Sequence, residues 1–234
     1  MLTPIIEVQQ LNHFYGRDRL RRQVLFDIHL SLRPGEIVIM NGPSGSGKST
    51  LLSLIGGLRS VQSGGLQVLG QALQGASDRA LENLRRQIGF IFQSHSLLTA
   101  LTAQQNVQMS LVLDRRVNMR EAKVRSRQML AQVGLADHCH QYPHQLSVGQ
   151  QQRVAVARAL VHQPPLILAD EPTAALDKVS GRTVVELMQQ LAKRQQCTIL
   201  LVTHDSRILD IADRIIELED GCLTTPQSVL EAVL

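Results

Sequence analysis

The chain has 234 residues, of which 44% are apolar and 19% charged, with a net charge of +4. These values are typical of a soluble domain with one large core, and no apolar run approaches the roughly 18–20 residues that span a bilayer. The N-terminus lacks the basic start and apolar run of a signal peptide. Three cysteines without metal-binding spacing favour a reducing, cytosolic setting. The basic excess would suit nucleic acid or an anionic membrane surface, although we expect most of it on a solvated face.

Residues 5–8, 24–30 and 66–69 are strand-like runs, and residues 37–40 form a fourth, fully apolar run. A glycine-rich loop follows this fourth run and comprises Gly42, Pro43, Ser44, Gly45, Ser46, Gly47, Lys48 and Ser49. Thr50 then opens an apolar stretch that we expect to begin a buried helix.

A glycine-rich loop between a strand and a helix is the structural context in which such loops bind phosphate. Its glycines let backbone N–H groups converge on phosphate oxygens, and the helix N-terminus adds a positive dipole end. Lys48 would neutralise the β and γ phosphates, while the Ser49 hydroxyl would hold Mg²⁺. A Gly/Ser turn that ends by chance in Lys-Ser fits this context far less well. The loop therefore predicts a nucleoside triphosphate site.

The chain between residues 97 and 162 is rich in Gln and Arg, and its apolar residues follow helical spacing. Pro164 and Pro165 end this helical region. Another apolar run, residues 166–169, leads into Asp170 and Glu171. Because open α/β sheets bind ligands at the carboxyl ends of their strands, Asp170 would hold Mg²⁺ through water and Glu171 would be the general base. A strand followed by an acidic turn is the alternative, and the phosphate-binding loop upstream argues against it.

A family resemblance rests on Leu146, Ser147, Val148, Gly149 and Gln150, which continue into residues 151–160, QQRVAVARAL. This run resembles the signature motif of ATP-binding cassette (ABC) ATPases, usually LSGGQ followed by QRVAIARAL. The resemblance implies that the motif opens a helix and contacts the γ-phosphate of ATP held by a second subunit. The Ser147 hydroxyl and the Gly149 and Gln150 amides would then face that anion. Val148 departs from the family pattern, which mostly has Gly there.

Four further residues match the family's motifs by their order in the chain. Gln93 is similar to the Q-loop glutamine that senses Mg²⁺ and the transport domain, and Asp177 ends a segment resembling the D-loop at the dimer interface. His204 resembles the H-loop histidine that contacts the γ-phosphate. Tyr15 resembles the aromatic residue that stacks on adenine, which implies ATP. Taken singly, each is more simply a polar residue at a strand end or a half-buried aromatic, so their joint order carries the interpretation.

The resemblance implies an α/β fold in which residues 1–234 form a single ABC nucleotide-binding domain. A P-loop ATPase core with an antiparallel β lobe would comprise residues 1–92 and 163–234. An inserted helical subdomain with the signature motif would comprise residues 93–162.

Within the family, residues 43–58, 92–107 and 169–177 most resemble the macrolide-exporter and lipoprotein-release group (MacB and LolD type). Together with residues 21–28 they resemble the cyanobacterial DevA-type ATPases, which power a glycolipid exporter with a periplasmic adaptor. The resemblance implies an ATP-dependent homodimer on the cytoplasmic face of the inner membrane, attached to a separate permease and an adaptor, with no nucleic acid partner. A division-signalling ABC ATPase, which pairs with a membrane subunit without transporting a substrate, remains the alternative.

Overall fold

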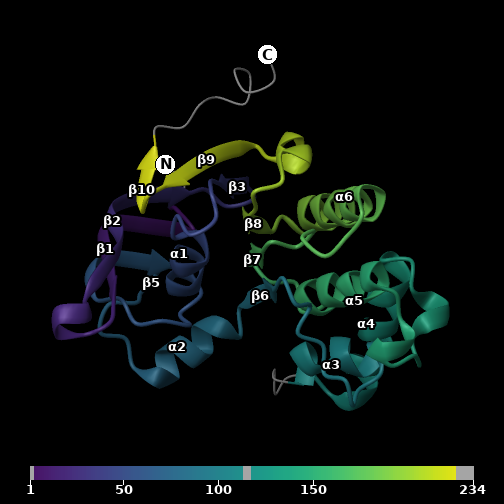
Figure 1. The fold of residues 1–234 in the computed structure, drawn as a ribbon. Coiled ribbons are helices and arrows are strands. Elements are labelled where there is room, and N and C mark those ends of the chain that lie inside the picture. Colours follow the sequence, from purple (N-terminus) through teal and green to yellow (C-terminus); the bar gives the residue numbers. More distant parts are fainter. Residues whose placement is uncertain (1–2, 113–116, 225–234) are drawn as a thin grey trace.

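The computed structural model describes residues 3–112 and 117–224 and places them in two sheets and several helices (Figure 1). The antiparallel sheet has the order β2-β1-β4-β5, and the six-stranded sheet has the order β10-β9-β3-β8-β7-β6. The strands are β1 (Ile6–Tyr15), β2 (Arg22–Leu32), β3 (Ile37–Asn41), β4 (Ser63–Val68), β5 (Gln71–Ala72), β6 (Ile88–Ile91), β7 (Leu166–Asp170), β8 (Thr198–Val202), β9 (Arg214–Glu219) and β10 (Cys222–Thr224). The α-helices are α1 (Lys48–Ile55), α2 (Asp78–Arg85), α3 (Ala103–Val112), α4 (Met119–Gln132), α5 (Val148–Leu160) and α6 (Lys178–Gln195).

The six-stranded sheet is parallel from β6 through β7, β8 and β3 to β9, and β10 is added antiparallel to β9. Its central strands are apolar on both faces, as expected for parallel strands covered on both sides. In β3, Ile37 and Ile39 pack into one cluster with residues of α5 and α6, whereas Val38 and Met40 pack into a second cluster with α1 and the antiparallel lobe. The core thus lies on both sides of this sheet.

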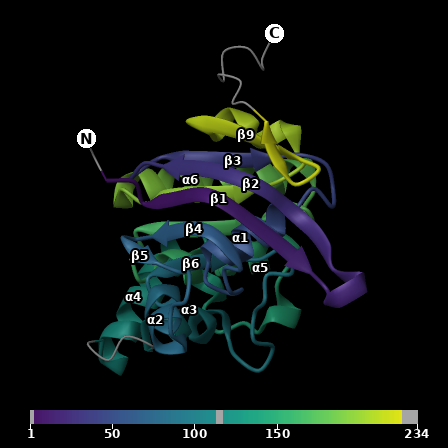
Figure 2. The same ribbon diagram turned by 90° about the vertical axis from the view of Figure 1, so that its left-hand side faces the viewer.

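The antiparallel lobe extends further than its sequence suggests. Residues 5–8 were expected to be a short strand, but β1 continues to Tyr15 and pairs with both β2 and β4. Register shifts interrupt these pairings, and Gln10 and Asp27 adopt positive φ of 49° and 45°. These bulges disturb the alternation of inward and outward side chains, so the strand cannot be followed by its pattern alone. In Figure 2 the β1–β2 hairpin projects away from the rest of the molecule.

The helical region contains α3, α4 and α5, which lie together beyond β6 in Figure 1. All three fall within the predicted subdomain 93–162, and the strands of the six-stranded sheet fall outside it. The α/β fold class with an antiparallel lobe and inserted helices is confirmed, while the exact domain boundaries stay a prediction.

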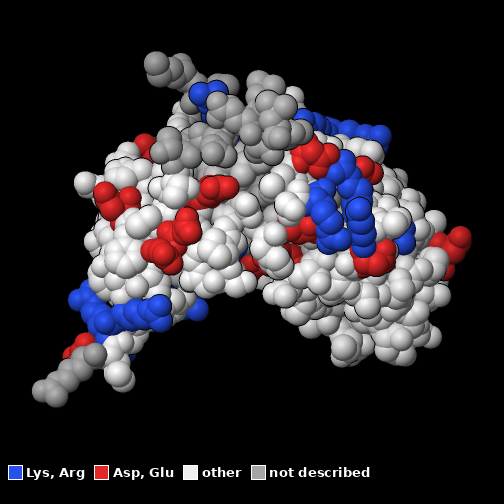
Figure 3. Space-filling model, turned by 45° about the horizontal axis from the view of Figure 1, so that its top comes forward, with Lys and Arg blue, Asp and Glu red and all other residues white. Residues whose placement is uncertain are grey.

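Charged side chains of both signs are interleaved over the face drawn in Figure 3. Arg182 on α6 pairs with Asp210, and Arg207 pairs with Asp205. On the face that Figure 3 draws, basic side chains lie beside acidic ones.

Candidate nucleotide-binding site

The glycine-rich loop connects β3 to α1 as predicted, and its backbone needs glycine at specific points. Gly42 has φ 142°, and a Cβ there would lie 2.1 Å from the Leu218 carbonyl oxygen. Gly47 has φ 105° and precedes α1 directly, with the Leu25 side chain 2.9 Å from the place of a Cβ. Side chains at these positions would clash as well as strain the backbone, so the loop can keep this shape only with glycine.

The Lys48 ammonium group is folded back onto its own loop. Its Nζ donates 2.7 Å hydrogen bonds to the carbonyls of Gly42 and Pro43. Burial lowers the pKa of Lys48, and the nearby carboxylates of Glu171 and Asp170 partly oppose that shift. A buried ammonium group whose hydrogen bonds go to carbonyls of its own loop fits an anionic ligand at this loop.

Ser49 and Asp170, the two residues expected at a metal, lie in direct contact. The Ser49 hydroxyl donates to Asp170 Oδ1 at 3.0 Å, which joins the start of α1 to the end of β7. Burial, with help from Glu171, raises the pKa of Asp170, whereas the Ser49 hydrogen bond and Lys48 oppose the rise. Hydroxyl and carboxylate oxygens suit Mg²⁺, which takes few protein ligands beside substrate phosphates. The described residues contain no group of three His, Cys, Asp or Glu side chains that could hold a metal ion by themselves.

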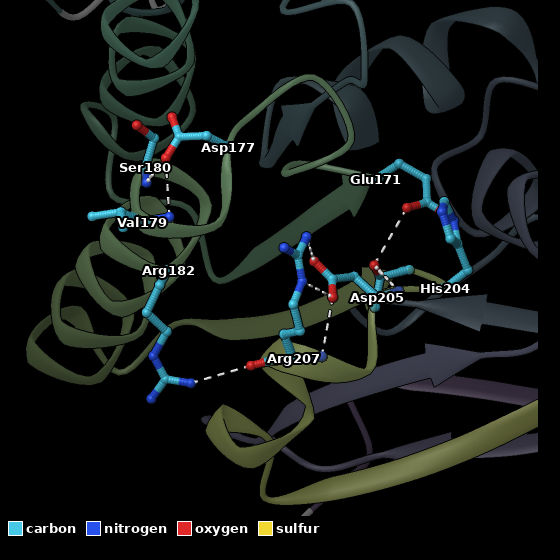
Figure 4. Close-up of polar contacts among 9 residues, drawn as sticks. Glu171, Asp177, Val179, Ser180, Arg182, His204, Asp205 and Arg207 are labelled. Carbon is cyan, nitrogen blue, oxygen red and sulfur yellow. Dashed lines mark hydrogen bonds and ion pairs between the residues drawn. The ribbon is translucent and has the colours of Figure 1, made fainter.

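Glu171 follows β7 with a left-handed backbone, φ 47°, and its amide donates to the Val202 carbonyl. Both of its carboxylate oxygens are held. His204 Nδ1 lies 2.7 Å from Oε1, and the Thr203 hydroxyl donates to Oε2 at 3.3 Å. Figure 4 shows His204 turned toward Glu171 in this arrangement. The predicted base and the predicted γ-phosphate sensor therefore touch each other.

One pocket of about 360 Å³ collects most of the predicted residues. Its lining comprises Tyr15, Val24, Ser44, Gly45, Gly47, Lys48, Ser49, Thr50, Gln93, Glu171 and His204. Gly42 and Pro43 line a second pocket that also includes His204, and Ser46 is a buried residue of the same loop. The lining thus combines β1 and β2 of the antiparallel lobe with the segments that follow β3, β6, β7 and β8 at the carboxyl edge of the parallel sheet, where α/β folds bind ligands.

The Tyr15 ring has a fixed position beside this pocket. Its hydroxyl lies 3.1 Å from Thr50 Oγ1, and the ring packs edge-on against His13. The Arg59 guanidinium lies 5.0 Å from the ring centroid, within cation–π range. The ring is therefore anchored at its hydroxyl end and along one edge, as a stacking platform would require.

The signature residues lie apart from that pocket. Ser147 is the N-cap of α5, and its hydroxyl accepts the Gln150 amide while the Gln150 side chain accepts the Ser147 amide. This capping box uses the Gln150 amide, which we had expected to face an anion. Within the described residues, the Val148 and Gly149 amides have no acceptor. They remain available for an anion from outside the chain.

Asp177, another predicted nucleotide contact, is the N-cap of α6 and accepts hydrogen bonds from the amides of Val179 and Ser180. Ser147 and Gly149 line a small pocket of about 140 Å³ together with Val179 and Ser180. None of these residues lines the pocket of Lys48. The structure thus brings Asp177 and the signature together, but it does not bring them to the phosphate-binding loop of the same chain.

Thr203 was missed by the sequence analysis. It is fully buried, and it touches Glu171 only because β7 and β8 are neighbours. In the sequence, only its position immediately before His204 pointed to a place at the site.

Fold and pocket together define a P-loop nucleotide-binding protein, in which the N-terminus of α5 lies outside the pocket of Lys48. The ABC transporter family matches residues 25–174, and the chain belongs to that family and carries its ATPase domain. The chain is 44% identical over 218 residues to the macrolide export ATP-binding/permease protein MacB of Aggregatibacter actinomycetemcomitans. The aligned residues make up 93% of this chain and 34% of that protein. The MacB protein of Escherichia coli (strain K12) is 41% identical over 236 residues, 99% of the chain and 36% of that protein.

The chain therefore spans about a third of the length of these MacB relatives. Among solved structures, a dimeric post-hydrolysis state of the ATP-binding cassette MJ0796 bound to ADP and Pi has a TM-score of 0.88 and 36% identity, over 96% of this chain and 98% of that one. CbiO1 of Clostridium perfringens, part of the ABC transporter complex cbiONQ, has a TM-score of 0.87 and 27% identity, over 98% of this chain and 90% of that one. The resemblance to the MacB group is confirmed, and the finer resemblance to DevA-type ATPases stays a prediction.

Proposed function

We propose that this chain binds Mg·ATP in the pocket of Lys48 and hydrolyses it to drive a separate membrane permease. The observation that carries the proposal is one pocket lined by Lys48, Ser49, Glu171 and His204, in which Ser49 is hydrogen-bonded to Asp170 and Glu171 to His204. These groups supply three requirements of phosphoryl transfer: Lys48 neutralises charge, the Ser49–Asp170 pair provides a metal position, and Glu171 provides a base.

The chain's own residues define the steps. Lys48 exchanges its loop carbonyls for phosphate oxygens, and Tyr15 stacks on the adenine. Ser49 and Asp170, with Gln93 at the pocket wall, would hold Mg²⁺, which would neutralise charge on the phosphate oxygens. Glu171 takes a proton from the attacking water as the oxygen bonds to the γ-phosphorus and the bond to ADP breaks. His204 moves from Glu171 to the γ-phosphate.

A homodimer completes each site. Because the amides of Val148 and Gly149 lie away from the pocket of the same chain, a γ-phosphate can meet them only on a second copy. The proposed dimer places ATP between the loop of one copy and the signature of the other, and Asp177 lies beside that signature at the α6 N-terminus. The relative MJ0796 is described as dimeric, which supports this arrangement.

No helix among the described residues has both the length and the hydropathy to cross a bilayer. We assign the membrane step to a permease and place this chain at the cytoplasmic face of the inner membrane through it. The MacB relatives carry ATP-binding and permease functions under one name, which supports this coupling.

A periplasmic adaptor and a lipid-like or glycolipid substrate complete the proposal. The alternative function, division signalling through a membrane subunit, shares the same ATP site.

The decisive experiment uses Glu171→Gln, which keeps the size of the side chain but removes the base. We expect ATP binding to persist and turnover to fall about 10²–10⁴-fold. Light scattering should show monomers without nucleotide and dimers with Mg·ATP. Lys48→Ala is the companion variant and should lose ATP binding itself. Full hydrolysis by Glu171→Gln, or a dimer fraction that ATP does not change, would overturn the proposal.

A further inference from the structure

Thr203 lies at the point where three strands of the parallel sheet meet the candidate site. It follows β8 directly, and β8 runs between β3 and β7. The Thr203 amide donates to the Met40 carbonyl on β3, and its hydroxyl reaches Glu171 just beyond β7. The residue is completely buried. Its side chain therefore has no freedom to seek another partner.

The direction of its hydrogen bond follows from its neighbours. The Asp205 amide donates to Thr203 Oγ1 at 3.0 Å. Since a hydroxyl has a single hydrogen, and an ionised carboxylate can only accept, the Thr203 hydrogen points to Glu171 Oε2. Asp205 is fixed in turn, because its carboxylate accepts from the Arg207 amide and guanidinium. Figure 4 shows Arg207 and Asp205 joined in this way beside His204.

The two oxygens of Glu171 are held by very different partners. The His204 side chain is 60% exposed and the Glu171 side chain only 13%. An exposed histidine can turn to a nucleotide at little cost, but a buried threonine cannot leave the carboxylate. When His204 moves, Oε1 becomes free to accept a proton while Oε2 keeps its donor.

We propose that Thr203 is a positioning residue for the catalytic glutamate, which holds Glu171 Oε2 so that Oε1 faces the attacking water. This inference rests on the proposed role of Glu171 as the base. The left-handed backbone of Glu171, φ 47°, makes such a restraint necessary, because a non-glycine residue in this region is held there only by its surroundings. Thr203 acts through Glu171 and has no contact of its own with the pocket.

The test compares Thr203→Val, which keeps the shape but removes the hydroxyl, with Thr203→Ser, which restores it. We expect kcat to fall about ten- to hundredfold in Thr203→Val, as for a small misplacement of a reacting group, with KM for ATP and ATP-driven dimerisation unchanged. Thr203→Ser should recover most of kcat. Thr198→Val is the matched control, because Thr198 is equally buried at the other end of β8 and its hydroxyl accepts the Gly35 amide.

A double-mutant cycle separates this inference from the proposed function. With Glu171→Gln already in place, Thr203→Val should change the residual rate by less than about twofold, since groups that act as a unit are non-additive. Three outcomes would each overturn the role of Thr203 and leave the proposed function standing. They are a wild-type kcat in Thr203→Val, an equal loss of kcat in Thr198→Val, and additive losses of rate in the double-mutant cycle. Full turnover by Glu171→Gln would instead remove the proposed function itself.

Discussion

Arg158 on α5 donates a 2.6 Å hydrogen bond to the carbonyl of Ser96, three residues beyond Gln93. The same guanidinium donates to the His95 carbonyl at 2.8 Å. His95 and Ser96 both have positive φ, 62° and 48°, which is uncommon for residues other than glycine. Arg158 thus stabilises an unfavourable turn, and it joins the helix that begins with the signature to the segment that follows Gln93.

We expect Arg158→Ala to lower the free energy of unfolding by about 2–4 kcal/mol, because two charge-assisted hydrogen bonds to a strained turn are lost. Urea unfolding measures this change. Hydrogen exchange should show faster opening of residues 93–98, which a general loss of stability would not single out. Arg153→Ala is the control on the same helix, since Arg153 makes one longer contact, 3.4 Å, to the Val133 carbonyl. Equal effects of the two variants would contradict the assignment.

Substitutions at the start of α5 should separate helix geometry from ligand contact. Val148 is the first residue of α5, does not have positive φ, and is 45% exposed. Val148→Gly should therefore change ATPase activity by less than about tenfold and stability by no more than about 1 kcal/mol. A Cβ on Gly149 would meet Ser180 at an ordinary 3.6 Å, so Gly149→Val should fold.

The same Gly149→Val change should abolish ATP-driven dimerisation, because the side chain would block the approach of a γ-phosphate to the amide. Paired ATPase and light-scattering assays on the two variants provide the comparison. A large acceleration by Val148→Gly would mean that the natural valine weakens the signature.

Leu98 should mark the permease contact. Its side chain is 49% exposed, while Asn106 holds its backbone by accepting from its amide and donating to its carbonyl. We expect the permease to contact this exposed apolar side chain, whose backbone is held by Asn106. Leu98→Asp should reduce transport by the reconstituted complex at least tenfold and leave the ATPase activity of the free subunit nearly intact. Leu101 is expected to act in the same way.

Leu97 packs partly against the core, so its substitution should lower stability and both activities together. It therefore serves as the contrast to Leu98. Parallel loss of ATPase and transport in Leu98→Asp would point to a folding defect and against docking.

Local patterns predicted the parts of the site that are contiguous in sequence. The loop around Lys48 and the pair Asp170–Glu171 could be read directly, because each motif carries its own strand and turn. The pattern Ser147-x-x-Gln150 before a helix also predicts a capping box, whereas the family resemblance implies a ligand contact for the same residues. Contacts between residues far apart in the chain could not be predicted from the sequence. Thr203 meets Glu171 across 32 residues and Arg158 meets Ser96 across 62, and only the strand order and helix packing bring them together.

His162, just beyond the end of α5, should make stability depend on pH below neutrality. Burial, with a smaller contribution from Arg125, lowers the pKa of His162 from 6.5 to about 4. Neither ring nitrogen has a hydrogen-bond partner among the described residues. Between these two pKa values the unfolded chain binds a proton that the folded chain does not, so the stabilising contribution is complete above pH 6.5 and is lost as pH falls toward 4. The full shift corresponds to roughly 3 kcal/mol.

Urea unfolding at several pH values between 4 and 7 measures this dependence. We expect His162→Leu to flatten the slope in that window, because it removes the titrating group while keeping an apolar side chain of similar size. His140→Leu, which replaces an exposed histidine, should leave the slope unchanged. If His162→Leu and the wild type lose stability in parallel on acidification, the titration belongs to other groups and His162 is protonated without cost in the folded chain.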